Sequence, residues 1–448
     1  MVVVPRDSLI GLEMFESARR LVAGSSAKRL VAVNSGWLLA DKLVRASLGL
    51  LVGAWVARYL GPAHFGVLAY LLAYVAMFQP FANLGADAIV VRNLSQEPRS
   101  AAEVLGTALA LRIAFGLGCW LIAVAIALII DRDGGDLAVL AAIVGGVLLF
   151  QAADVVDLWF QSQTQSRLTV IAKLVAFLAS NGAKIGLILA GAQLSAFAIL
   201  AALEGLLSAL AMFVAYRRYR TDRFWTATKV TSRAILAECW PFMLSGFAIM
   251  VYMRIDQIMI KEILGAEQLG LYAAVLPISQ FWQVLPLALA TSLGPFLAKQ
   301  RVADVAAYQR SMVLVFRGFF YLGIFSVVAT LAVSGWLVPR LFGGAYSAAV
   351  LILDLHAISN MFCFLGIAHS LWLVNERLFA VRLYGTLLAG LASVGMNAVL
   401  LPRIGLPGAC MAAIAAQAIA ALFINALLDR RSFRLQVEAI TFRRIREC

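Results

Sequence analysis

The chain has 448 residues, of which 62% are hydrophobic and only 14% are charged, and its mean hydropathy is +0.90. Soluble domains carry about 25% charged residues, so this composition excludes a soluble globular protein and predicts an all-α polytopic membrane protein. The apolar runs are continuous, whereas the strands of a membrane β-barrel alternate apolar and polar residues.

Residues 1–33 precede the first long apolar run. Within them, Leu9 to Val22 has the pattern of an amphipathic helix and carries Arg19 and Arg20. Such a helix is expected to lie on the membrane surface. A frayed N-terminal tail is the alternative.

The rest of the chain predicts about twelve transmembrane spans, because a span needs roughly 20 apolar residues. The apolar runs fall at residues 35–58, 66–91, 104–130, 137–160, 168–190, 194–216, 236–260, 270–298, 310–333, 347–374, 378–401 and 406–428. We therefore expect a segment 1–33, an N-lobe of six spans (34–216), a basic linker (217–235), a C-lobe of six spans (236–428) and a basic tail (429–448). Around residues 334–350, Pro339, Gly343 and Gly344 interrupt an apolar stretch, and we expect a short interfacial helix there.

The distribution of Lys and Arg predicts the orientation of the chain. With twelve spans, one set of connections holds 24 Lys and Arg residues and the alternate set holds 5. Cytoplasmic loops carry the excess of positive charge, so both termini and the linker 217–235 are predicted to be cytoplasmic. The net charge of +13 is then explained by orientation, and no nucleic-acid partner is expected.

The two halves share a turn pattern. Leu60-Gly61 is followed by Gly66, and Leu264-Gly265 is followed by Gly270, an offset of 204 residues. We interpret this as an internal duplication, which is a common plan in secondary transporters. Since each lobe has an even number of spans, the lobes should be related by an axis along the membrane normal, with a cavity between them.

Eight cations lie within the predicted spans. A charged side chain at mid-bilayer costs about 2.5–3.5 kcal/mol on insertion scales, so such residues usually face protein or water. Lys42, Lys173 and Arg382 are close enough to span ends to reach the interface. The deeper five are expected to contribute to a wet cavity and to bind substrate: Arg45, Arg112, Lys184, Arg254 and Arg317.

Acidic residues supply candidate partners and candidate ion-coupling groups. Asp41 precedes Arg45 by four residues and can pair with it along one helix. Asp87 is expected to pair with Arg92. Glu204 has no obvious local partner and is the best candidate for a protonatable group, with Asp256 and Asp87 as further candidates for H⁺ or Na⁺ coupling.

The sequence contains no motif for a disulfide framework, a metal site or a nucleotide-binding phosphate loop. The five cysteines are scattered without a C-x-x-C motif, and the three histidines lie far apart, so we predict neither a disulfide framework nor a metal site. The chain has no G-x-x-x-x-G-K-[ST] phosphate loop. No organic cofactor is expected.

Several stretches resemble the Wzx-type polysaccharide flippases of the multidrug/oligosaccharidyl-lipid/polysaccharide (MOP) exporter superfamily, which also contains the MATE transporters. They occur in the family's order between about residues 30 and 428, and they read VARYLGPAHFGVLAYLLAY, NLGADAIVVR, YMRIDQIMI, LGAEQLGLYAA, LFGGAYSAAVLILDLHAIS and MNAVLLPRIGLPGACMAAIAAQ. The resemblance implies a non-enzymatic flippase that moves a polyprenol-diphosphate-linked oligosaccharide across the bacterial inner membrane by alternating access. It also implies membrane lipids and the polysaccharide polymerase machinery as partners, and we expect a monomer.

Three other functions are considered. An ion-coupled small-molecule antiporter of the multidrug type would have a smaller, more acidic pocket, which the intramembrane cations argue against. A membrane enzyme, such as a glycan polymerase, would usually carry a large periplasmic loop, but the predicted periplasmic loops are short. A non-catalytic scaffold would leave the buried charges unexplained.

Overall fold

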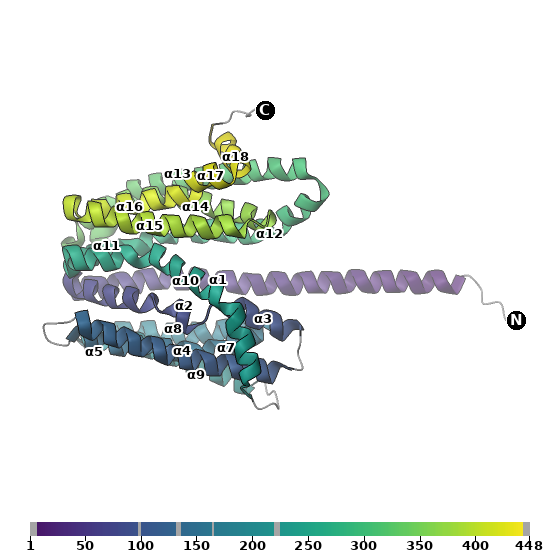
Figure 1. Cartoon of the computed structure of the whole chain (residues 1–448), viewed down its shortest axis with the longest axis horizontal. Helices are drawn as coiled ribbons and strands as arrows, with labels where there is room; N and C mark the ends of the chain where they lie inside the picture. The colour runs from purple at the N-terminus through teal and green to yellow at the C-terminus, as the bar shows by residue number, and fades with distance from the viewer. Residues whose placement is uncertain (1–6, 97–99, 131–135, 164, 219–224, 442–448) are drawn as a thin grey trace.

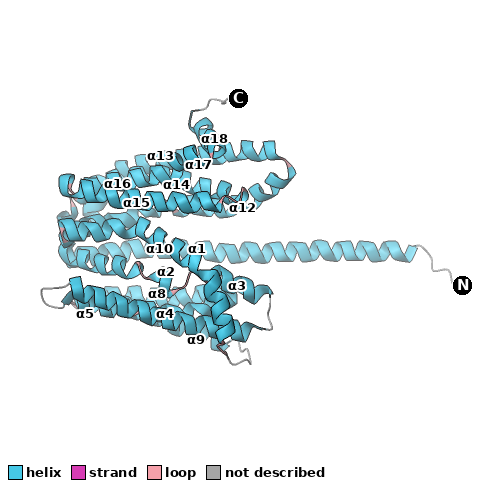
Figure 2. Ribbon diagram, in the orientation of Figure 1, coloured by secondary structure: helices cyan, strands magenta, loops and turns pink. Residues whose placement is uncertain are grey.

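The structure is a computed structural model that describes the backbone of residues 7–96, 100–130, 136–163, 165–218 and 225–441. Side chains are described within these ranges from residue 42 onward, except those of Ser166 and Phe379. The described chain is built of helices joined by short turns (Figure 2). This confirms the predicted all-α polytopic membrane protein.

The helices of the two halves follow one another along the chain. The first half contains α1 (Asp7–Ala76), α2 (Gln79–Ala82), α3 (Asp87–Gln96), α4 (Ala101–Ile130), α5 (Asp136–Gly145), α6 (Val147–Phe150), the 3₁₀ turn η2 (Gln151–Asp154), α7 (Val155–Ser162), α8 (Ser166–Leu189) and α9 (Leu194–Arg218). The second half contains α10 (Lys229–Leu264), α11 (Ala266–Phe281), α12 (Val284–Ala303), α13 (Val305–Phe342), the 3₁₀ turn η3 (Gly344–Tyr346), α14 (Ala349–Asn375), α15 (Phe379–Ile404), α16 (Leu406–Ala418), the π-helical turn η4 (Ile419–Phe423), α17 (Ile424–Leu428) and α18 (Arg430–Thr441).

Eleven described stretches are long and apolar enough to cross a membrane. The first of them, Lys42–Gln96, has 55 residues and turns back at Gly61, so it crosses twice and the count agrees with twelve spans. Gly61 has φ 72° and ψ 168°, and Gly265 has φ 94° and ψ 170°. Since a positive φ favours glycine, the matching backbone angles at this spacing of 204 residues support the internal duplication.

The structure differs from the sequence-based expectation in two regions. Residues 334–350 do not form a separate interfacial helix, because α13 continues through Pro339 to Phe342 and ends at Gly343, where φ is 88°. The N-terminal segment forms the beginning of α1, which runs without a break from Asp7 into the first span and projects away from the bundle (Figure 1). The side chains of residues 7–41 lie outside the description, so the Asp41–Arg45 pair and the amphipathic face stay predictions.

The lobes lie side by side and are not parallel (Figure 1). They meet at the end that holds the turns at Gly61 and Gly265, which we call the turn end, and they diverge toward the end from which α1 projects, which we call the basic end. One apolar core at the turn end contains residues of both lobes, among them Ala57 and Tyr70 of α1 with Tyr272 and Tyr346 from the second half.

Helix α10 crosses from one lobe to the other (Figure 1). Its first turns are fixed to the N-lobe, because Arg92 binds Glu238 at 2.5 Å and Glu103 accepts hydrogen bonds from Thr228 and Thr231. Its later part packs against α15 in the C-lobe. The structural boundary between the lobes therefore runs along α10.

Candidate transport pathway

Two glycines of the repeated turn bring the backbones of the lobes into close contact. A Cβ atom on Gly66 would lie 1.7 Å from the carbonyl oxygen of Ala266, and a Cβ on Gly270 would lie 1.9 Å from that of Pro62. Only hydrogen fits at either position, so each repeat presses a glycine against the backbone of the other. We call these four residues the glycine clasp.

Other inter-lobe contacts surround the clasp at the turn end. The buried Tyr346 hydroxyl donates a hydrogen bond to the carbonyl of Ala57 at 2.8 Å. Arg58 donates to the carbonyl of Arg340 at 3.4 Å. The ammonium of Lys261 lies 4.6 Å from the ring centroid of Tyr70. The turn end is therefore closed by backbone packing, hydrogen bonds and a cation–π contact.

The N-lobe encloses a cavity of about 520 Å³ between α1, α6, η2, α8 and α9. Lys184 of α8 and Glu204 of α9 both line it and form an ion pair at 2.9 Å. The hydroxyl of Ser180 donates to the same carboxylate oxygen at 2.8 Å. Glu204 thus has no local partner, as expected, but it has a distant one, because the packing of α8 on α9 joins residues 20 apart that no helical spacing connects.

Two further cations lie beside the N-lobe cavity. The guanidinium of Arg45 is 5.0 Å from the ring centroid of Phe177, which lines the cavity. Lys173 binds Asp154 and Asp157, each at 2.8 Å, and Asp154 is also a lining residue. The sequence placed Lys173 at a span end and did not reveal this three-residue cluster, since α7 and α8 come together only in the folded lobe.

The C-lobe holds a second cavity of about 720 Å³. Asp256 of α10 lines it and accepts hydrogen bonds from the hydroxyl of Tyr272 and from the backbone N–H of Gln257. His356 and His369 lie on another part of the wall, and His356 Nδ1 is 2.9 Å from the Ser279 hydroxyl. Of the candidate coupling residues, Glu204 and Asp256 therefore line different cavities.

The remaining predicted cavity cations are placed elsewhere. Arg112 is 2% exposed and binds Asp87, while Arg92, the expected partner of Asp87, binds Glu238 instead. Arg317 donates to the carbonyl oxygens of Ala439 and Glu438 in α18, at 3.2 and 3.5 Å.

Arg254 is half-buried and is not among the described residues that line these two cavities. Of the five cations, Lys184 lines the N-lobe cavity and Arg45 adjoins it. The convergence of all five on one substrate chamber stays a prediction.

An apolar groove of about 840 Å³ runs where α4 faces α10. Its wall includes Phe81, Phe115 and Ile122 from the N-lobe with Phe247 and Ile255 from α10. Ile122 is 55% exposed. The groove therefore lies at the boundary of the lobes and includes an exposed apolar side chain.

The chain was compared with known proteins. Residues 31–301 match the family model described as polysaccharide biosynthesis protein, which is more than half of the chain. No curated protein gives a significant match.

Solved structures of MOP superfamily transporters share the fold. The lipid II flippase MurJ in an inward closed conformation gives a TM-score of 0.70 at 12% identity, with 90% of this chain and 91% of that chain covered. A multidrug resistance MATE family transporter in an inward-facing conformation gives 0.69 at 14% identity, covering 88% and 95%. A MATE family transporter in an outward-facing conformation gives 0.59 at 17% identity, covering 91% and 96%.

These matches agree with the geometry of two six-span lobes that meet at one end and diverge at the other. The chain belongs to the polysaccharide biosynthesis protein family, and it is a multi-pass membrane protein whose fold is that of the solved MOP superfamily transporters.

Proposed function

We propose that this transporter is a flippase that moves a polyprenol-diphosphate-linked oligosaccharide across the membrane by alternating access. The observation that carries the transport mechanism is the glycine clasp with its surrounding contacts, which close the turn end while the lobes diverge at the basic end. A carrier that works by rocking two lobes needs one closed end and one open end in each state. The family match and the sequence resemblance support the substrate class.

Lys184 and Arg45 are the cations that we assign to the diphosphate. Both lie at the N-lobe cavity, one in its wall and the other against the wall residue Phe177. Ammonium and guanidinium groups bind phosphate oxygens through charge-assisted hydrogen bonds. The apolar groove between α4 and α10 suits the polyprenyl chain, since its wall is apolar and includes the exposed side chain of Ile122.

Glu204 and Asp256 are the carboxylates that we assign to H⁺ or Na⁺ coupling. Each lines a cavity in its own lobe, and each is hydrogen-bonded by a neighbouring hydroxyl, from Ser180 and Tyr272 respectively. Export that persists at the normal rate after the ion gradients have been collapsed would remove this part of the proposal.

The proposed location is the bacterial inner membrane, with the basic end in the cytoplasm. In this orientation the lobes diverge toward the side on which lipid-linked oligosaccharides are assembled. A contact with the polysaccharide polymerase machinery and a monomeric state stay predictions.

The function is tested by removing the protein. In a deletion strain, the lipid-linked oligosaccharide should accumulate in the cytoplasmic leaflet, and the wild-type gene should restore export. Accessibility of the glycan to a membrane-impermeant lectin or glycosidase reports which leaflet holds it.

The competing small-molecule antiporter predicts a different phenotype. A deletion strain with normal glycan export and increased sensitivity to cationic drugs would favour that antiporter and exclude the flippase.

A further inference from the structure

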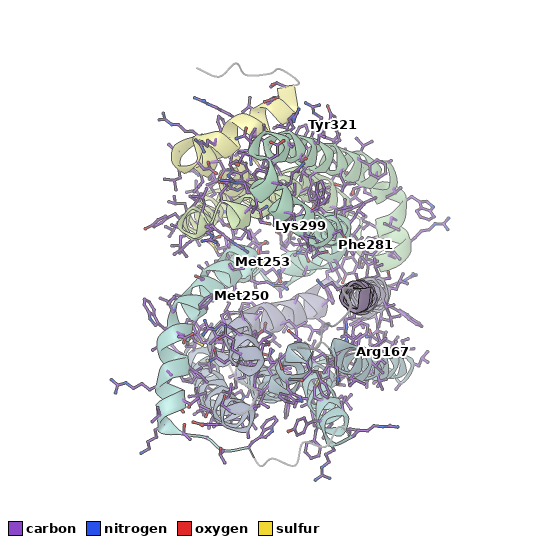
Figure 3. The ribbon with its side chains drawn as sticks, turned by 90° about the vertical axis from the view of Figure 1, so that its right-hand side faces the viewer. Arg167, Met250, Met253, Phe281, Lys299 and Tyr321 are labelled. Atoms are coloured by element: carbon purple, nitrogen blue, oxygen red, sulfur yellow. The ribbon has the colours of Figure 1, made fainter. Side chains whose placement is uncertain are left out.

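Helix α18 (Arg430–Thr441) lies across the long axis of the bundle, whereas α1 runs along that axis. In Figure 3, which looks along α1, α1 is seen end-on while the yellow α18 is seen along its length at the outer edge of the C-lobe. Figure 1 places it on α13, on the side of the C-lobe that faces away from the N-lobe. This orientation is that of a helix lying in the plane of a membrane surface.

A polar anchor holds α18 in this position. Asp429 accepts hydrogen bonds from the indole N–H of Trp372 at 2.7 Å and from the backbone N–H of Ser432 at 3.2 Å. Asn425 donates to Gln436 at 3.2 Å. At the other end of the helix, Arg317 donates to the carbonyls of Glu438 and Ala439. Docking therefore uses fixed hydrogen bonds, and the arginines of α18 itself take no part in these contacts.

The surface of α18 divides into three stripes. At about 100° per residue, the fully buried Ser432, Gln436 and Ala439 form one stripe against the protein. Phe433 and Val437, both half-buried, form an apolar flank. The third stripe is exposed and mainly basic: it contains Arg430, Arg431 and Arg434, with the half-buried Glu438 between Arg434 and Arg431, so its net charge stays positive.

We propose that α18 is a binding element for anionic phospholipid, with its basic stripe on the headgroups and its apolar flank on the upper part of the acyl chains. Helices that lie at a membrane interface combine a basic face with an apolar face. Each Lys or Arg near an anionic lipid surface adds to the affinity for the membrane. The depth of the helix fits this partner, because α18 directly follows the last candidate span, which ends at Leu428. Phe423 and Leu427 beside it are 63% and 76% exposed, as expected for side chains that face lipid.

The apolar flank favours a lipid surface over an acidic protein as the partner. An acidic protein would use the charges of the basic stripe alone, whereas Phe433 and Val437 sit beside that stripe where the acyl chains of the same lipids would lie. Asn425, which donates a hydrogen bond to Gln436 of α18, also lines the C-lobe cavity. This residue therefore connects α18 to the wall of that cavity. The inference goes beyond the proposed function and is independent of the transported substrate.

The test is amide hydrogen–deuterium exchange of the full-length protein in lipid nanodiscs. In nanodiscs that contain phosphatidylglycerol, the amides of residues 430–441 should exchange roughly tenfold more slowly than in phosphatidylcholine alone. High salt should remove the difference, because it screens exposed charges. The variant R430Q/R431Q/R434Q should exchange at one rate in both lipids.

Two matched variants separate charge from folding. R430K/R431K/R434K keeps the charges and should keep the lipid dependence. R217Q/R218Q/R233Q removes three exposed cations from α9 and α10, and should leave the exchange of α18 unchanged. Equal exchange of wild-type α18 in the two lipids would overturn the proposal, and an acidic protein would then be the better partner for the basic stripe. Slow exchange of the R430Q/R431Q/R434Q variant in phosphatidylglycerol would overturn it as well.

Discussion

The ion pair between Lys184 and Glu204 is the residue-scale feature on which the binding site depends. The two side chains are 26% and 33% exposed, and the pair lies in the wall of a cavity within the membrane. Removing one partner of this half-buried pair leaves an uncompensated charge, which destabilises the fold, though by less than the loss of one partner from a fully buried pair. A single substitution therefore changes stability as well as any contact with substrate, and the two effects have to be separated.

A double-substitution cycle separates them. Lys184→Gln and Glu204→Gln should each lower the melting temperature of the purified protein, because each leaves one charge unpaired. The double variant should recover most of the melting temperature, since two neutral amides replace the pair. Export by the double variant should nevertheless stay at least about tenfold below wild type if Lys184 binds the diphosphate or Glu204 couples the ion, which would be a loss of about 1.4 kcal/mol or more.

Recovery of both stability and export in the double variant would show that the pair of Lys184 and Glu204 has only a structural role. If the double variant exports glycan at the wild-type rate, Lys184 does not contact the substrate and the assignment fails. Measuring protein in the membrane fraction of each strain controls for expression.

At the scale of elements, the glycine clasp determines how closely α1 and α11 approach. Pro62 and Gly66 of α1 meet Ala266 and Gly270 of α11 backbone to backbone, so no side chain can rearrange to make room. This is why the contact depends on glycine at both positions.

Gly66→Ala and Gly270→Ala should each hold the turn end open. The added methyl group would overlap a carbonyl at 1.7 or 1.9 Å, so the helices must separate. We expect export to fall by about tenfold or more, measured as surface glycan, with the protein still in the membrane. Gly318→Ala is the matched control, because nothing lies within 4 Å of its Cβ position in α13. Wild-type export by both clasp variants would show that this contact is not needed for transport.

At the scale of the whole molecule, transport requires the closed turn end to open. Arg58 and Arg340 are exposed at this end and belong to different lobes, and the Arg58 side chain reaches the backbone carbonyl of Arg340 at 3.4 Å. A covalent link between these two positions would hold the lobes together there, whatever residues contact the substrate.

A cross-link tests this motion. In the variant Arg58→Cys/Arg340→Cys, a short bis-methanethiosulfonate cross-linker, which forms a disulfide with each cysteine and releases methanesulfinate, should stop export, and reduction of the disulfides should restore it. The single variants treated with the same reagent are the controls, and they also account for the native cysteines. Continued export at high cross-linking yield would mean that the lobes do not separate at the turn end.

Long sequence patterns predicted most of the fold. Twelve apolar runs gave the spans, and the repeat at Gly61 and Gly265 gave the two matched turns, because both depend on a local property, hydropathy or a positive φ. The sequence did not show that α13 runs on to Phe342, since a proline near the end of a helix can either break or continue it.

The candidate site was predictable only in part. The cost of charge in the bilayer selected Lys184 and Arg45, which lie at a cavity, but the same argument selected Arg112 and Arg317. Arg112 forms an ion pair with Asp87, and Arg317 donates to the backbone of α18. The cost of burying a charge predicts that it has polar surroundings, and it does not say whether these are water, a carboxylate or a helix end.

The sequence by itself determined that this protein is a two-lobed helical membrane protein with its basic connections at one end, because hydropathy and charge act residue by residue along the chain. The tertiary structure alone decided which charges meet, which cavity each lines and which end of the bundle is closed. Those features depend on helices that are distant in the sequence, such as α1 with α11 and α13 with α18, and no local pattern records which helices become neighbours.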